Sequence, residues 1–152
     1  LDEFFIAYGK QNRAAGELVW RITVPKLQAI ETFRAYKISK RFDQDISALL
    51  LALKITRNGD KIVSARLAMG GMAATPKRAA QTEAALQKVD LQNQATWGSA
   101  IDALFEDYQP ISDVRASAQY RIETAQALLR KALTEIVQDF ELRVINSAEV
   151  AA

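Results

Sequence analysis

The richest group of chemically capable side chains in this chain lies in one short stretch that mixes cations, hydroxyls and carboxylates. It reads Tyr36-Lys37-Ile38-Ser39-Lys40-Arg41-Phe42-Asp43-Gln44-Asp45. In one interpretation, a cationic strand residue faces a ligand beside a mobile polar loop, and the cations suit an anionic or electron-accepting ring. In the other, a strand ends in a solvated surface loop. Side-chain periodicity does not choose between them.

The two acids of this stretch, Asp43 and Asp45, would share one face if the segment were a strand. A pair of carboxylates can hydrolyse a glycosidic bond when one of the two acids is buried, because burial raises its pKa. In a loop both acids are solvated instead. We favour the solvated pair, because the surrounding residues are polar and charged.

The residue types that are missing exclude several kinds of chemistry. The chain has 152 residues with no Cys and no His, which rules out a thiolate nucleophile, iron–sulfur ligation, an imidazole base and the usual zinc sites. A Ser-His-Asp hydrolase is excluded for the same reason. The pair Gly70-Gly71 fits neither GxGxxG nor GxxxxGK[ST]. A formal net charge of +2, spread along the chain, is too small for a phosphate-binding surface.

The length predicts one domain, and the apolar runs are too short to predict a membrane span. The longest of them, Ala48–Leu53, has the size of a strand. The first residue is Leu1 rather than Met, so we expect a processed product or a piece of a longer protein. The absence of Cys and His agrees with a cytoplasmic protein, and cytoplasmic is the location we expect.

The elements that would position these side chains begin with strands. Leu18–Val24 alternates apolar and polar residues up to Pro25, which predicts a half-buried strand with Leu18, Trp20, Ile22 and Val24 on one face. Phe33–Ile38 predicts a second strand, followed by a loop over residues 39–45.

A β-hairpin is the next predicted element. Its strands are Ile46–Thr56 and Lys61–Met69, and Asn58-Gly59 between them is typical of a type I′ turn. Gly70-Gly71 permits a backbone turn after the second strand that a side chain would block.

Helical periodicity takes over in the second half of the chain. It predicts helices over Lys77–Lys88, capped by Thr75, and Trp97–Tyr108, capped by Thr96, and a long helix over Ser117–Phe140. The second of these has Ile101, Leu104, Phe105 and Tyr108 on one stripe. The apolar stripe of the long helix is more typical of a domain core than of a groove for a partner. Strands followed by helices predict an α+β fold, an antiparallel sheet of about three to four strands followed by three helices packed on one face.

Three separated blocks of the sequence resemble one known family. They are FRAYKISKRFDQDIS, ARLAMGGMAATPKRA and PISDVRASAQYR. They resemble the C-terminal domain of the FAD-binding subunit of bacterial xanthine dehydrogenase and, more widely, of the molybdenum hydroxylase and CO dehydrogenase flavoproteins. The earlier runs FFIAYGK and GELVWRITVP resemble the end of the preceding FAD-binding domain. The resemblance implies a lead-in strand over residues 1–25, the flavoprotein C-terminal-like domain over 26–142 and a tail over 143–152.

The resemblance also implies a function. In this family a molybdenum centre on molybdopterin hydroxylates the substrate, and electrons pass through two iron–sulfur clusters to FAD and then to NAD. The chain would be the domain that caps the flavin, inactive alone, in an NAD-dependent xanthine dehydrogenase of purine catabolism. Its partners would be the preceding FAD-binding domain, an iron–sulfur domain and the molybdenum-binding large subunit, with no nucleic acid and no membrane. The Gly-rich loops that grip the FAD diphosphate are not in this sequence.

Four residues match cofactor contacts of the family, and none matches a catalytic residue or a metal ligand. Lys37 aligns with a lysine that approaches the flavin ring, and Val19 with an apolar residue that packs on it. Arg41 and Asp45 keep a basic and an acidic residue of a mobile loop near the nicotinamide side of the flavin, where charge biases the choice between NAD and oxygen.

Several alternatives remain beside this interpretation. Phe42 and Gln44 depart from the arginine and the acid of the animal enzymes, so an electrostatic gate does not carry over intact. Lys37 could be an exposed strand lysine, and Val19 could pack beneath a neighbouring strand. The parent could be a sister enzyme acting on carbon monoxide, nicotinate or an aromatic thioester, or the domain could be a non-catalytic interaction domain that has lost flavin.

Overall fold

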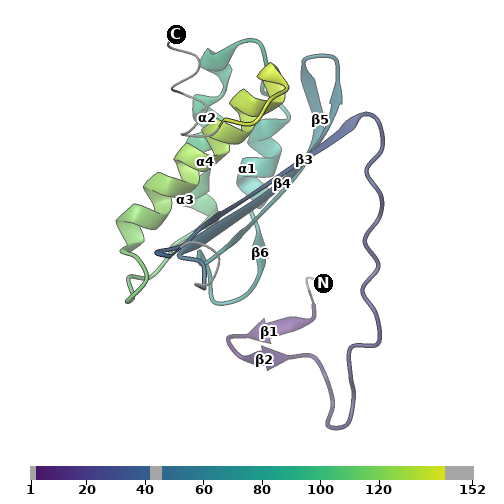
Figure 1. The fold of residues 1–152 in the computed structure, drawn as a ribbon, viewed down its shortest axis with the longest axis vertical. Helices are drawn as coiled ribbons and strands as arrows, with labels where there is room; N and C mark the ends of the chain where they lie inside the picture. Colours follow the sequence, from purple (N-terminus) through teal and green to yellow (C-terminus); the bar gives the residue numbers. More distant parts are fainter. Residues whose placement is uncertain (1–2, 42–45, 143–152) are drawn as a thin grey trace.

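The fold has two layers, a four-stranded antiparallel sheet and a set of helices that cover one of its faces (Figure 1). The structure is a computed structural model and describes residues 3–41 and 46–142. The sheet consists of β3 (Glu31–Ile38), β4 (Leu49–Asn58), β5 (Lys61–Gly70) and β6 (Lys77–Arg78) in that order. The helices are α1 (Ala80–Leu86), the 3₁₀ turn η1 (Gln94–Thr96), α2 (Gly98–Asp102), α3 (Leu104–Asp107) and α4 (Ala118–Gln138). The predicted α+β fold is confirmed.

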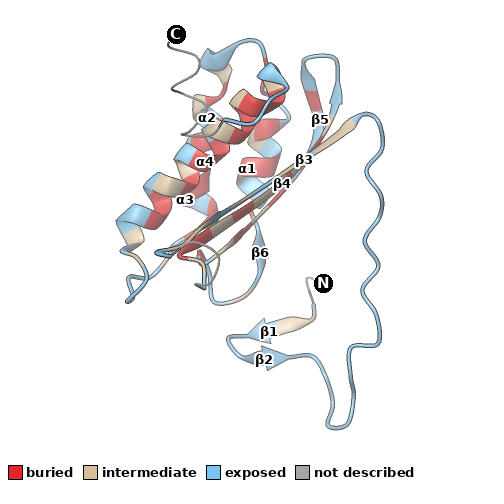
Figure 2. Cartoon of the chain, viewed as in Figure 1, coloured by how far each residue is buried: buried red, intermediate tan, exposed pale blue. Residues whose placement is uncertain are grey.

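The core lies between the sheet and the helices, as the red residues in Figure 2 show. Strand β4 is the clearest case, since alternate residues point to opposite faces of a sheet. Its helix-facing residues, Leu49, Leu51, Leu53 and Ile55, are all 0% exposed, whereas Leu50 and Ala52 between them are only half-buried. The difference between the two sides means that one face of the sheet is covered and the other is not.

The predicted hairpin between β4 and β5 is present, but its turn is displaced by one residue from the predicted type I′ turn. Asn58 pairs with Lys61, so the loop residues are Gly59 and Asp60. Gly59 has φ +58° and is the residue of this turn with a positive φ. The register shifts after Thr56 because β5 has a bulge there, in which Val63 is left without a partner residue on β4. One positive φ at the first loop residue is typical of a type II′ turn.

Helix α1 begins later than predicted and is capped by a different residue. Lys77 and Arg78 pair with β5 as strand β6, so the helix starts at Ala80 and Thr75 does not cap it. The cap comes from Asp107, whose carboxylate accepts hydrogen bonds from the backbone N–H of Gln81 (3.0 Å) and of Thr82 (2.8 Å). Because Asp107 lies 25 residues away in sequence, local pattern could not reveal it.

The second predicted helix is divided into η1, α2 and α3. Thr96 does not cap it, because its hydroxyl donates to the Asn93 carbonyl (2.7 Å) and accepts from the Asp90 N–H (3.0 Å). Ile101, Leu104 and Tyr108 are buried as predicted. Phe105, predicted on the same stripe, is 56% exposed, because it lies about 100° further round the helix than Leu104.

Helix α4 agrees with the prediction apart from its last residues. The Ser117 hydroxyl caps it by accepting from the Tyr120 N–H at 3.1 Å. The predicted stripe is buried in the domain core as far as Ile136. Asp139 then takes a left-handed conformation with φ +55°, which ends the helix before Phe140.

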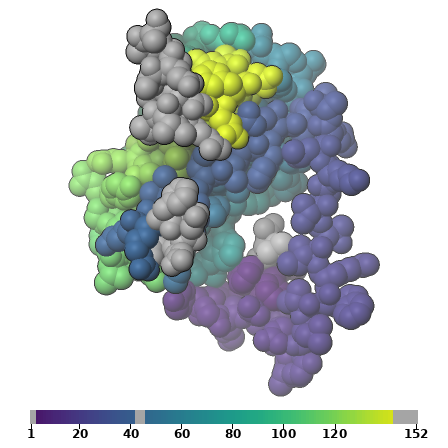
Figure 3. Space-filling view, viewed as in Figure 1, coloured from purple at the N-terminus to yellow at the C-terminus, as the bar shows by residue number. Residues whose placement is uncertain are grey.

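The N-terminal segment does not form the predicted strand. Apart from β1 (Phe5–Ala7) and β2 (Lys10–Gln11), residues 3–30 have no strand, and most of them are exposed (Figure 2). Leu18, Trp20, Ile22 and Val24, predicted on a half-buried face, are 71%, 85%, 72% and 80% exposed. A strand needs a neighbour for its hydrogen bonds, and no described strand lies beside this segment. In Figure 3 open space separates much of it from the body of the domain.

The helices of the described ranges include none whose length and hydropathy would let it serve as a membrane span.

Candidate functional site

The uncovered side of the sheet carries four rows of side chains across β3, β4 and β5, and we call the three rows beyond Glu31–Thr56–Ser64 the open face. All helices lie on the other side of the sheet in Figure 1. Strand pairing sets the rows: Phe33–Lys54–Arg66, then Ala35–Ala52–Ala68, then Lys37–Leu50–Gly70. The two outer rows carry the larger and the charged side chains. The middle row is entirely alanine and forms a shallow floor between them.

The alanine row allows close approach of a flat group. Neighbouring strands are about 4.8 Å apart, so three alanines in register make a floor about 10 Å long. Methyl side chains do not hold a planar ring away from the sheet, and the row next to them ends in Gly70. Such a floor flanked by cations fits one side of a planar, electron-accepting ring.

Lys37 is the cation of this face that most resembles a ligand contact. Its side chain is exposed, and no hydrogen bond or ion pair joins it to any residue that the structure describes; the same is true of the exposed Arg66. Lys54, in the row beyond the alanines, differs because its Nζ lies 2.6 Å from a carboxylate oxygen of Glu31. The positive charge of Lys37 is therefore available to a group outside this chain.

The other three predicted contact residues do not join Lys37 in one site. Val19 is 54% exposed and lines a cavity of about 410 Å³ formed within the N-terminal segment itself. Arg41 is exposed, and its carbonyl accepts a hydrogen bond of 2.8 Å from the Ser39 hydroxyl. Asp45 lies outside the described residues, as does Asp43 of the proposed acid pair.

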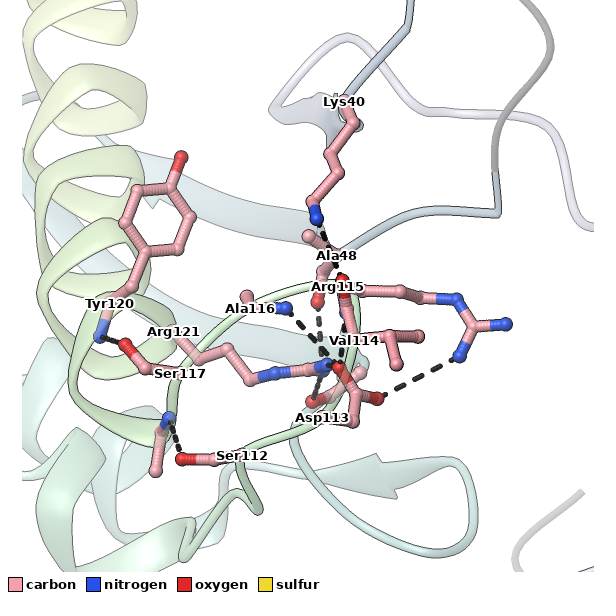
Figure 4. Close-up of polar contacts among 12 residues, drawn as sticks. Lys40, Ala48, Ser112, Asp113, Val114, Arg115, Ala116, Ser117, Tyr120 and Arg121 are labelled. Carbon is pink, nitrogen blue, oxygen red and sulfur yellow. Dashed lines mark hydrogen bonds and ion pairs between the residues drawn. The ribbon is translucent and has the colours of Figure 1, made fainter.

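A buried arginine holds the end of the sheet next to this loop (Figure 4). Arg121, 3% exposed, donates to the Ala48 carbonyl at 2.8 Å, to the Gly71 carbonyl, and to the Asp113 carboxylate at 2.7 Å. Gly71 has φ +77°, and a Cβ there would lie 2.4 Å from the Ala48 oxygen, as the predicted need for glycine implies. The arginine joins the start of β4, the end of β5 and the start of α4.

Asp113 receives several donors at this point. The backbone N–H of Arg115, followed by that of Ala116 and by the Arg121 guanidinium, holds the pKa of Asp113 below its usual value. Beside the network, a cavity of about 550 Å³ is lined by Lys40, Val114 and Tyr120 among others, and Lys40 Nζ donates to the Val114 carbonyl at 2.7 Å. The contacts of Arg121 with Ala48 and Gly71 join residues far apart in the sequence, and no sequence signal marks them.

Comparison with known proteins decides the family. Residues 34–136 match the family described as the CO dehydrogenase flavoprotein C-terminal domain. The chain belongs to this family. The match runs from within β3 to within α4, so Lys37 and all of the open face except Phe33 lie inside it, and Val19 lies outside it. The resemblance drawn from the three sequence blocks is confirmed.

Relatives and solved structures agree with this flavoprotein domain. The chain is 34% identical over 127 residues to nicotinate hydroxylase of Emericella nidulans, covering 80% of this chain and 9% of that protein. It is 31% identical to the glyceraldehyde dehydrogenase medium chain of Sulfolobus acidocaldarius, covering 88% and 47%. CO dehydrogenase from Hydrogenophaga pseudoflava has a TM-score of 0.78 at 25% identity, over 88% and 46%. The chain thus spans about half or less of these relatives.

The chain fits part of an FAD site. The domain is a C-terminal domain of the FAD subunits of molybdenum hydroxylases. The chemistry of its open face, a flat alanine floor beside an uncompensated ammonium, fits a flavin ring. It has no Gly-rich loop to hold a diphosphate. The rest of the cofactor would have to be held by another part of the protein.

Proposed function

We propose that this domain closes over the flavin ring of an FAD held by the preceding domain of the same subunit, in a molybdenum hydroxylase. The observation that carries the proposal is the position of Lys37 on the only face of the described sheet that no helix covers. When bound, FAD would supply the centre that accepts electrons from iron–sulfur clusters and passes them on. The partners would be an iron–sulfur domain and a molybdopterin-binding large subunit.

The ammonium of Lys37 would tune that cofactor electrostatically. A positive charge near the ring stabilises the electron-rich reduced form more than the oxidised form. A difference of about 1.4 kcal/mol corresponds to roughly 30 mV for a two-electron couple. One lysine is enough to change how easily the flavin is reduced, and the alanine floor would let the ring approach it.

Residues 1–25 would belong to the preceding domain, with the C-terminal domain over 26–142 and a tail after it. Support comes from the strict alternation of Leu18–Val24 together with the exposure of its apolar side chains, which is the pattern of a strand whose sheet is elsewhere. In that sheet Val19 would point away from the Leu18–Val24 apolar face and toward the cofactor. Arg41 and Asp45 would lie near the nicotinamide side of the flavin.

For the parent we propose an NAD-dependent xanthine dehydrogenase. Relatives that carry this name are 28% identical over 148 residues in Blastobotrys adeninivorans and 27% identical over 146 residues in Emericella nidulans. The second candidate is a sister hydroxylase of an aromatic acid such as nicotinate, favoured by the 34% identity with nicotinate hydroxylase. Both candidates assign the same role to this domain, so activity assays of the full enzyme with xanthine and with nicotinate separate them.

The test of the flavin contact is the Lys37→Met variant in the complete FAD subunit. We expect its flavin potential to fall by roughly 30 mV or more, since the reduced ring loses its stabilising charge. Lys88→Met is the matched control, because Lys88 is exposed beyond the end of α1 in the helix layer. Spectroelectrochemical titration of both variants measures the effect. An unchanged potential in Lys37→Met, or an equal change in the control, contradicts the proposal.

A further inference from the structure

A partly buried cluster of charged and polar side chains lies behind Lys37, on the opposite face of the same strand. We call it the Glu135 cluster, and its members are Arg34, Tyr36, Lys131 and Glu135. Glu135 is 1% exposed although it is a carboxylate. One of its oxygens accepts a 2.6 Å hydrogen bond from the Tyr36 hydroxyl and lies 3.5 Å from Arg34 Nε. The other accepts from Lys131 Nζ and from the Leu142 N–H at 2.8 Å.

The cluster is costly to build, which suggests a role beyond holding the fold together. Burial acts to raise the pKa of Glu135, but the bonds from Lys131, Tyr36 and the Leu142 N–H lower it below the usual value. The carboxylate stays ionised inside the domain because three hydrogen-bond donors converge on it and Arg34 lies beside it. A well-packed apolar group is often as stable as a buried ion pair, and what the pair adds is a defined geometry.

The geometry that this cluster would define is the position of β3. This strand is at the edge of the sheet, hydrogen-bonded to β4 alone among the described strands. On its helix side it offers Arg34, Tyr36 and Ile38, and two of these three contact Glu135 of α4. Lys131 also lies over the Tyr36 ring, 5.0 Å from its centroid. The contact between β3 and α4 therefore depends largely on one carboxylate.

Tyr36 and Lys37 are consecutive residues, so what fixes one fixes the backbone of the other. Tyr36 is opposite Leu51 of β4, which is 0% exposed, and Lys37 is opposite Leu50 on the open face. An edge strand that lost its bond to α4 would be free to twist about β4. Such a twist would tilt Lys37 toward or away from the alanine row.

We propose that Tyr36 and Glu135 are positioning residues for Lys37: their hydrogen bond clamps the edge strand to α4 and sets the height of the lysine ammonium over the open face. The inference rests on the proposed contact of Lys37 with the flavin ring. It goes beyond that contact, because residues on the helix-covered face of the sheet would control the position of a charge on the open face.

The variant Tyr36→Phe in the complete FAD subunit tests this, because it removes one oxygen and keeps the ring. Tyr108→Phe is the matched control. The Tyr108 hydroxyl is also buried and donates a 2.7 Å bond to the Lys77 carbonyl, but it holds β6 and not β3. We expect both variants to lower the unfolding temperature. Only Tyr36→Phe should shift the flavin potential, in the direction of Lys37→Met and by a smaller amount.

The double variant Tyr36→Phe/Lys37→Met separates positioning from a general structural effect. If Tyr36 acts through Lys37, adding Tyr36→Phe to Lys37→Met produces no further shift of potential. A potential that responds to Lys37→Met but not to Tyr36→Phe overturns the positioning role and leaves the proposed function standing. An equal Tyr36→Phe shift in both backgrounds also overturns it. A flavin potential that Lys37→Met leaves unchanged contradicts the proposed function and, with it, the positioning role.

Hydrogen exchange tests the inference even if the Tyr36→Phe subunit no longer retains FAD. The amides of β3 should then exchange faster than in the native subunit, while those of β5 stay unchanged. Exchange of β3 at the native rate would show that the hydroxyl does not clamp the strand, and would refute the inference.

Discussion

The two faces of the sheet differ in how far the chain's own residues bury and pair the side chains on them. On the helix side, Leu49, Leu51 and Leu53 are fully buried, and even the Glu135 carboxylate accepts hydrogen bonds from three donors. On the open face, a row of alanines lies beside Lys37, which has no partner among the described residues. The first face is completed within the chain. The second has the composition of a surface that contacts a group outside this chain.

The largest expected effect comes from one pair of leucines on β4. Leu51→Ala empties a fully buried position and should cost about 2–5 kcal/mol of unfolding free energy. Leu50→Ala makes the same chemical change on the open face and should cost about 1 kcal/mol or less in this chain. Urea denaturation of both variants measures the difference. Equal losses would mean that the open face is as well packed as the core, and the comparison would fail.

A smaller effect is expected from acid. The pKa values of Glu135 and Asp113 lie below their ordinary values of 4.5 and 3.8. Carboxyls with lowered pKa values in the folded state stabilise it above their ordinary pKa, and that stability is lost as the pH falls through the folded-state value. The unfolding temperature should therefore be flat above about pH 5 and fall below about pH 4.

The variant Glu135→Gln supplies the control for the acid effect. It is less stable at neutral pH, but its unfolding temperature should fall less steeply below pH 4, because one of the carboxyls with a lowered pKa is gone. Thermal melts across this range in parallel check both statements. Identical slopes for the two proteins would show that Glu135 does not titrate with folding.

The core elements were predictable because their signals are local. Alternation located β3, the Asn58-Gly59 pair between two β-rich runs located β4 and β5, and apolar residues at helical spacing located α4. The start of α1 was missed because its cap, Asp107, belongs to a later helix. Leu18–Val24 has a correct strand pattern but no partner strand in the described residues. A sequence pattern shows that a segment can form a strand, and pairing with another strand decides whether the strand forms.

The candidate site was predictable only in part. The side of β3 on which Lys37 lies followed from alternation, but its link to flavin came from resemblance and not from spacing. The alanine row across three strands could not be seen in the sequence, because register brings Ala35, Ala52 and Ala68 together from positions far apart. The bond from Tyr36 to Glu135 joins residues 99 apart, and no sequence signal marks it.

The measurement that tests the account most directly is an experimental structure of the complete subunit with FAD bound. The account predicts the flavin ring against the open face, with Lys37 Nζ within about 4 Å of a ring atom. It would be contradicted by a ring that meets other residues while Lys37 extends into solvent or lies beneath a neighbouring protein segment.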